Sequence, residues 1–124
     1  MEKDNIQLFY KTLKAFLKEF ISVFPNDDSL KIISTSLSLA IKEKDNKLID
    51  LFYNSFLPLS YLIDTRDDEF FMINTSIYYK NQYQCELFEK LKVYYFVLSE
   101  NNKTVIWDYI QNIFNICKEI NKIK

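Results

Sequence analysis

Four carboxylates and one arginine lie within six residues near the middle of this chain. The carboxylates are Asp64, Asp67, Asp68 and Glu69, and they surround Arg66, the only arginine in the sequence. Clustered carboxylates could bind a divalent cation or act as a general acid and base. However, a calcium loop of the EF-hand type needs a glycine and a distal glutamate at fixed spacing, and both are missing. We therefore interpret the cluster as a solvated loop that ends in the acidic first turn of a helix.

A row of lysines and a group of tyrosines are the candidate interaction residues. Lys11, Lys14 and Lys18 recur at spacings of three and four residues, which places them on one face of a helix. This face could contact phosphates, but Glu2 and Glu19 dilute its charge, and a solvated helix face is the simpler interpretation. The tyrosines are Tyr78, Tyr79, Tyr83, Tyr94 and Tyr95. They could stack on single-stranded nucleic acid, but few lysines lie near them, so we favour core packing and a protein interface.

Residue types on which many active sites depend are absent from this sequence. It contains no glycine, which excludes a P-loop, a dinucleotide-binding fingerprint and a nucleophile elbow. It contains no histidine, the commonest general base and metal ligand. Cys85 and Cys117 could form one disulfide, but we expect two buried free thiols in a reducing compartment. The sequence therefore predicts no catalytic residue, no metal site and no cofactor.

Apolar residues at helical spacing predict the elements that would position these candidates. A first helix is expected over 5–23, with Asp4 as its N-cap and Pro25 as its stop. A turn over 25–28 offers a cap for a second helix, which is expected over 29–43. The lysine row lies on the first of these two helices.

The middle of the chain is expected to continue in the same way. Asp45 or Asn46 can cap a third helix, which Pro58 ends or kinks before one more turn over 59–63. A fourth helix is expected after the carboxylate cluster, as far as Ile77, although its threonine and tyrosines also suit a strand.

The last third of the chain shows two clear helical patterns. One runs from about Leu87 to Leu98, and the final helix is expected over 104–121, capped by Asn102 or Thr104. Trp107 is expected to anchor the core. The residues that we expect to be buried together are Leu13, Phe16, Phe20, Leu91, Tyr109, Ile113 and Phe114. Short polar breaks between helices predict an all-α fold, a compact antiparallel bundle of five to six helices.

Length and composition indicate one domain that occupies residues 1–124. Hydrophobic residues make up 48% and charged residues 27%, which is typical of a globular protein. The formal net charge of −1 indicates no obligate polyanionic or anionic-membrane partner. No apolar run is long enough to span a bilayer, and the charged N-terminal residues do not resemble a secretory signal. We expect an intracellular protein that is not secreted.

Two terminal segments resemble a known group of proteins. The first, from Leu13 to Pro25, contains F-L-K-E-F followed by F-P, and the second, from Asn102 to Phe114, reads N-K-T-V-I-W-D-Y-I-Q-N-I-F. Both are similar to the opening and closing elements of small uncharacterised proteins encoded by giant nucleocytoplasmic DNA viruses. The matches cover about a quarter of the 124 residues. The resemblance implies a viral, mostly helical protein, and it carries no known activity and no catalytic residues.

These observations favour a non-enzymatic helical module for protein–protein interaction or structure, which the resemblance assigns to a large DNA virus. It would be a virion component or a host-factor-binding protein, with another viral or host protein, or a second copy, as its partner. The alternative is a nucleic-acid-binding accessory factor that uses Lys11, Lys14 and Lys18. We rank it lower because the chain is nearly neutral. An enzyme ranks third, because only carboxylate or lysine chemistry remains to it.

Overall fold

A computed structural model describes residues 2–42, 46–72 and 82–123 of this protein. The described residues form helices and turns and contain no strand, which confirms the predicted all-α fold. The elements are α1 (Glu2–Val23), α2 (Asp28–Lys42), α3 (Asn46–Phe56), the 3-10 turn η1 (Leu57–Leu59), α4 (Ser60–Asp64), the 3-10 turn η2 (Asp68–Phe71), α5 (Gln82–Tyr95) and α6 (Glu100–Ile123). No helix within the described ranges combines the length and the apolar character needed to cross a membrane.

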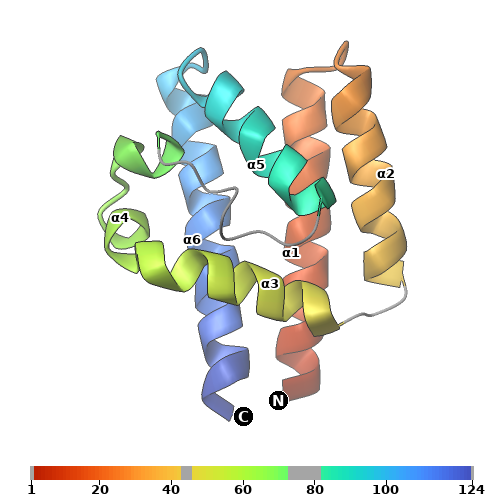
Figure 1. The fold of residues 1–124 in the computed structure, drawn as a ribbon, viewed down its shortest axis with the longest axis vertical. Coiled ribbons are helices and arrows are strands. Elements are labelled where there is room, and N and C mark those ends of the chain that lie inside the picture. Colours follow the sequence, from red (N-terminus) through yellow and green to blue (C-terminus); the bar gives the residue numbers. More distant parts are fainter. Residues whose placement is uncertain (1, 43–45, 73–81, 124) are drawn as a thin grey trace.

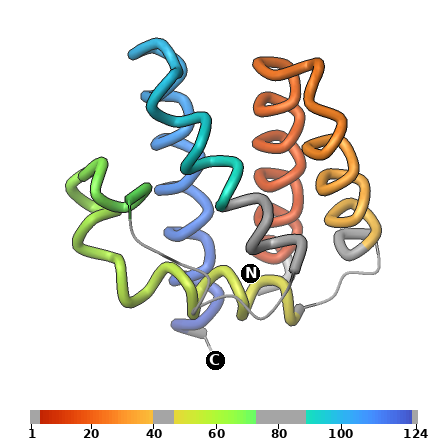
Figure 2. The backbone as a smooth tube through the Cα atoms, turned by 45° about the horizontal axis from the view of Figure 1, so that its top comes forward, coloured from red at the N-terminus to blue at the C-terminus, as the bar shows by residue number. Residues whose placement is uncertain are grey.

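The long helices α1, α2 and α6 form an antiparallel layer (Figure 1). In this layer α1 lies between α2 and α6, and its packing against α6 is the most extensive helix contact of the described chain. Two further helices cover one side of the layer: α5 slants across it and packs on α2, while α3 crosses it and packs on α6 (Figures 1 and 2). The predicted compact antiparallel bundle is confirmed, with α3 as a transverse member.

Apolar side chains from all of these elements form one continuous core. Six of the seven residues that the sequence predicted to be buried together are buried in it, namely Leu13, Phe16, Phe20, Leu91, Ile113 and Phe114. The prediction is wrong for Tyr109, which is half-buried at the edge of the core, with its ring 5.5 Å from the ring of Phe16. This edge position suits a phenol, because its hydroxyl otherwise needs a buried hydrogen-bond partner.

Trp107 is buried, as the sequence predicted, and it begins a chain of hydrogen bonds. Its Nε1–H donates to the hydroxyl of Tyr95 at 3.0 Å, and that hydroxyl donates to Oδ1 of Asp68 at 2.5 Å. The chain joins α6, α5 and η2. A buried indole N–H and a buried phenol are thereby both satisfied.

Two of the predicted helix caps are wrong. Asp4 does not cap the first helix, because α1 already begins at Glu2, and Asp4 lies within the first turn, where a carboxylate still favours the helix. Asn102 and Thr104 do not cap the last helix, because α6 begins at Glu100. Its cap is Ser99, whose hydroxyl accepts the backbone N–H of Asn102 at 3.2 Å.

The turns around the two prolines agree with the sequence. Val23 is the last residue of α1, just before Pro25, and Asp27 caps α2 by accepting the backbone N–H of Leu30 at 3.0 Å. Pro58 ends α3 through the turn η1, and the additional helical turn that we expected follows as α4. The cap predicted at Asp45 lies outside the described residues.

The chain after α4 differs from the predicted fourth α-helix. Asp67 caps the short turn η2, in which Asp68 and Glu69 form the acidic first turn that the sequence predicted. This element is a 3-10 turn of four residues. Ile73 and Ile77, which the prediction placed in the same helix, lie outside the described residues.

Arg66 lies between α4 and η2 and is the one described residue with a positive φ angle, which is 52°. Its N–H bonds to the carbonyl of Ile63 at 3.2 Å, and the N–H of Asp67 bonds to the carbonyl of Leu62 at 2.9 Å. These two bonds form a Schellman motif, which usually has glycine at the left-handed position. The chain has no glycine, so an arginine occupies the position and its side chain stabilises it.

Candidate functional site

The three predicted lysines line one groove on the surface. Lys11, Lys14 and Lys18 are exposed on α1 along its border with α2. The groove between these helices is open and has a volume of about 520 Å³. Its other lining residues are Ala15, Leu17 and Ile21 from α1 and Ser34 and Ser38 from α2. We call this surface the lysine groove.

The charge of the lysine groove is not neutralised within the described part of the chain. No described carboxylate lines the groove, and none of its three lysines takes part in an ion pair with a described residue. The groove therefore combines three cations with an apolar strip and two hydroxyl side chains.

The sequence of each helix explains how the groove forms. In α1 the lysines follow the helical repeat on the side away from the buried Leu13 and Phe16. In α2 the buried residues Leu30, Ile33 and Leu37 face the core. Short serine side chains lie beside them on the border with α1, so the aliphatic stems of the lysines stay uncovered.

A second polar cluster lies where the α1–α2 turn meets α5. Oδ2 of Asp27 accepts hydrogen bonds from Nζ of Lys90, at 3.0 Å, and from the hydroxyl of Tyr94. The Asp27 side chain is only 10% exposed. The ring of Phe24 stacks on the ring of Tyr94 with a centroid distance of 3.9 Å, so the cluster also has an apolar cover.

The electrostatics of this cluster suit a structural link. The hydrogen bonds from Tyr94 and Lys90 lower the pKa of Asp27 to about 2. The same carboxylate raises the pKa of Lys90 and the pKa of Tyr94. At neutral pH the aspartate and the lysine therefore stay charged and the tyrosine stays protonated. A general acid or base works best with a pKa near the working pH, and these shifts lead away from it.

The acidic residues around η2 have separate tasks. Oδ1 of Asp67 accepts the backbone N–H of Glu69 at 2.9 Å, and Asp68 accepts the hydroxyl of Tyr95. Asp64 and Glu69 are exposed. Across the described ranges, no three Asp, Glu, Cys or His side chains come together in a way that could hold a metal ion.

Arg66 points away from these carboxylates and toward α6. Its guanidinium donates to Oε1 of Gln111 at 3.1 and 2.8 Å and to Oδ1 of Asp108 at 2.5 Å. The amide of Gln111 in turn donates to the carbonyl of Ile63 at 2.9 Å. Arg66 is therefore a link between α4 and α6.

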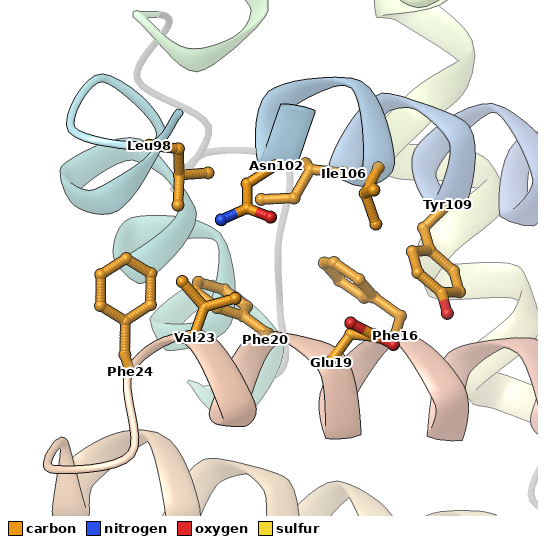
Figure 3. Close-up of a pocket in the computed structure, with 10 residues that line it drawn as sticks. Phe16, Glu19, Phe20, Val23, Phe24, Leu98, Asn102, Ile106 and Tyr109 are labelled. Atoms are coloured by element: carbon orange, nitrogen blue, oxygen red, sulfur yellow. The ribbon is translucent and has the colours of Figure 1, made fainter. Parts of the chain in front are cut away.

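A narrow apolar cleft separates α1 from α6 near the α5–α6 turn (Figure 3). Phe16, Phe20 and Val23 from α1 face Leu98 and Ile106, with a volume of about 20 Å³ between them. That is space for about one water molecule, whereas sites for small ligands typically occupy about 300–1,000 Å³. The cleft is too small to be a substrate or cofactor pocket.

Two tyrosines of the predicted group have described side chains, and both pack in or against the core, which is one of the two placements that the sequence favoured. Tyr95 is buried and stacks on Phe71 with a centroid distance of 3.9 Å, and burial raises its pKa to about 12. Tyr94 is half-buried in the cluster with Asp27, so neither ring is free to stack on a base. Tyr78 and Tyr79 lie outside the described residues, as does the side chain of Tyr83 on α5.

Cys117 is a buried free thiol, as the sequence predicted. Its Sγ lies 3.9 Å from the carbonyl oxygen of Ile49, and burial raises its pKa to about 12. A thiol in this state is a packing residue, because the reactive form of cysteine is the thiolate. The side chain of Cys85 lies outside the described residues.

Sequence reasoning found one wall of the groove and missed the rest. The serines of α2 carried no signal beyond their weak helix propensity. The cluster of Asp27 with Lys90 was missed because 63 residues separate the two, although Asp27 was visible as part of a cap. Comparisons with protein-family models, with curated proteins and with solved structures find no match to this chain.

Proposed function

We propose that this protein is a non-enzymatic, intracellular protein–protein interaction module and that the lysine groove is its docking surface. The terminal motifs support the further proposal that it serves a large DNA virus, as a virion component or a host-factor-binding protein. Its partner is then a viral protein, a host protein or a second copy of the chain.

One observation carries this proposal, namely the composition of the groove. Three exposed lysines flank an apolar strip of Ala15 and the half-buried Ile21, which lies over the buried Leu17, and no described carboxylate lines the surface. A partner segment with apolar and acidic side chains would bury the strip and pair with the lysines. Complementary charge of this kind gives an interface its orientation and its association rate.

The polar cluster around Asp27 supports a non-enzymatic role. Its pKa shifts hold Asp27, Lys90 and Tyr94 each in one protonation state at neutral pH. The cluster joins α5 to the α1–α2 turn and thereby supports one wall of the bundle.

Binding of nucleic acid is the second candidate, and the same three lysines favour it. Three phosphate contacts on duplex DNA would make the logarithm of the binding constant fall with the logarithm of salt with a slope of about −2.7. The apolar strip and the net charge of −1 favour a protein over a polyanion.

Photo-crosslinking in the cell that naturally expresses the protein tests the proposal. A crosslinking amino acid replaces Ser38, inside the groove, or Asn54, which is exposed on α3 and serves as the control. We expect a discrete protein adduct from position 38, none from position 54, and loss of the adduct in Lys14→Glu/Lys18→Glu. An adduct with nucleic acid would support the second candidate, and equal adducts from both positions would contradict a groove-specific role.

A further inference from the structure

Another exposed surface of the same chain has the opposite charge to the lysine groove. Building on the proposed function, we propose that the groove binds a second copy of this protein through its acidic corner. The acidic corner is the exposed surface of η1, α4 and η2, made of Leu57, Tyr61, Asp64, Asp67, Asp68, Glu69 and Met72.

The acidic corner has the charge that the groove lacks. All four of its carboxylates are exposed. The one cation in this stretch, Arg66, is engaged by Asp108 and Gln111 of α6, and no ion pair with another described residue neutralises the four carboxylates. The carboxylates of Asp67 and Asp68 accept hydrogen bonds within the chain. In the described contacts, the carboxylates of Asp64 and Glu69 accept none.

The acidic corner also carries apolar surface. Tyr61 is 63% exposed, Met72 is 66% exposed and Leu57 is 45% exposed. Tyr61 and Asp64 are three residues apart on α4, which places them on the same face of the helix. The corner thus pairs carboxylates with large apolar side chains, and the groove pairs lysines with an apolar strip. Each surface has the partner chemistry that the other one needs.

The helices that carry the two surfaces lie at opposite edges of the bundle. The groove belongs to α1 and α2, the corner belongs to α4 and its flanking turns, and α6 lies between α4 and α1 (Figures 1 and 2). One pairing therefore leaves a free groove on one copy and a free corner on the other. Such a contact is heterologous, so it adds copies head to tail into a chain or a ring and does not stop at a two-fold dimer.

The contact depends on charge, which makes it sensitive to salt and to charge reversal. Sedimentation equilibrium of the 124-residue chain from about 10 to 200 µM, at about 20 mM and about 500 mM salt, tests this dependence. At low salt we expect the mass to rise with concentration above the 15.0 kDa of one chain. At high salt we expect it to return to one chain.

Two charge-matched variants identify the surfaces. Lys14→Glu/Lys18→Glu reverses the charge of the groove, and Asp64→Lys/Glu69→Lys reverses the charge of the corner. All four positions are exposed. Circular dichroism checks that each variant keeps its helical fold. Each variant alone is expected to stay a single chain. Mixed one to one, the variants again supply complementary surfaces, because the intact groove meets the intact corner and the two reversed surfaces are also opposite in charge. We therefore expect the mass to rise above 15.0 kDa again. If the reversal variant Lys14→Glu/Lys18→Glu does not fold, the neutral variant Lys14→Gln/Lys18→Gln replaces it. We expect this variant to associate more weakly than the wild type.

Several results would overturn this proposal. A wild-type protein that stays at 15.0 kDa at low salt would do so, as would association that survives both reversals or a mixture that forms no complex. If the wild type stays a single chain while Ser38 still crosslinks to a different protein, the interaction function stands and self-association fails. If Ser38 captures no protein at all and the wild type stays a single chain, both proposals fail.

Discussion

At the scale of single residues, the carboxylate of Asp27 links the α1–α2 turn to both α2 and α5. Asp27 caps α2, pairs with Lys90 and accepts the hydroxyl of Tyr94, so the α1–α2 turn and α5 share it. Its pKa falls from 3.8 to about 2 on folding. A lowered pKa means that this contribution to stability is complete above about pH 4 and is lost as the pH falls toward 2.

Asp27→Asn tests this contribution, because asparagine keeps an acceptor for the cap and removes the charge. We expect the free energy of unfolding at pH 7 to fall by about 1–2 kcal/mol, less than the whole pKa shift implies, since the pair borders solvent. The difference between the two proteins should shrink to near zero at about pH 2. Urea unfolding at pH 7, 4 and 2 measures it. A constant difference across that range would contradict the assignment.

Arg66 is the second single residue whose effect on stability can be tested. Its backbone has the left-handed conformation that costs a non-glycine residue about 1–2 kcal/mol, and its side chain offsets that cost through Asp108 and Gln111. Two substitutions separate these effects. Arg66→Ala removes the side-chain bonds and keeps the strain, whereas Arg66→Gly removes both.

We therefore expect both variants to be less stable than the wild type, with Arg66→Gly more stable than Arg66→Ala by about 1 kcal/mol. Chemical unfolding at a fixed pH compares the two. Equal stabilities would mean that the strain at this position is relieved in another way. If Arg66→Lys were as stable as the wild type, the positive charge alone would offset the backbone strain, without the planar guanidinium.

At the scale of elements, the start of α6 shows what a local pattern leaves open. Ser99, Asn101, Asn102 and Thr104 can all act as caps by residue type. The structure selects Ser99, which accepts the N–H of Asn102, while the carbonyl of Ser99 accepts the N–H of Lys103 at 2.9 Å. Thr104 instead bonds back to the carbonyl of Glu100 at 3.1 Å, within the helix.

Ser99→Ala is expected to lower the free energy of unfolding by about 1 kcal/mol, because it removes the acceptor at the helix start. Thr104→Ala is the matched control and should be neutral or slightly stabilising, since alanine has the higher helix propensity. Thermal and urea unfolding of both variants measure the difference. A larger loss from Thr104→Ala than from Ser99→Ala would return the cap to the position that the sequence suggested.

At the scale of the whole molecule, aromatic rings hold the crossing helix against the layer. Phe114 of α6 is buried and lies 6.1 Å, centroid to centroid, from Phe56 at the end of α3. Phe16 of α1 is buried where α1 packs against α6. These two rings therefore report on two different contacts of the same core.

Phe16→Ala and Phe114→Ala should each lower the free energy of unfolding by about 3–5 kcal/mol, through lost burial and the cavity that remains. Ile32→Ala on α2 is the control, because Ile32 is 62% exposed and its loss should change stability by no more than about 0.5 kcal/mol. Calorimetry or urea unfolding measures all three variants. An unchanged melting temperature in either phenylalanine variant would place that ring outside the core.

The sequence by itself determined where the long helices form, which of their faces are apolar and where the prolines end them. It also placed the lysines on one face, because helical spacing is a property of neighbouring residues. Only the tertiary structure decided that α3 crosses the layer, that Asp27 meets Lys90 and that serines of α2 complete the groove. These outcomes depend on how side chains of separate helices fit together, and no local periodicity encodes that fit.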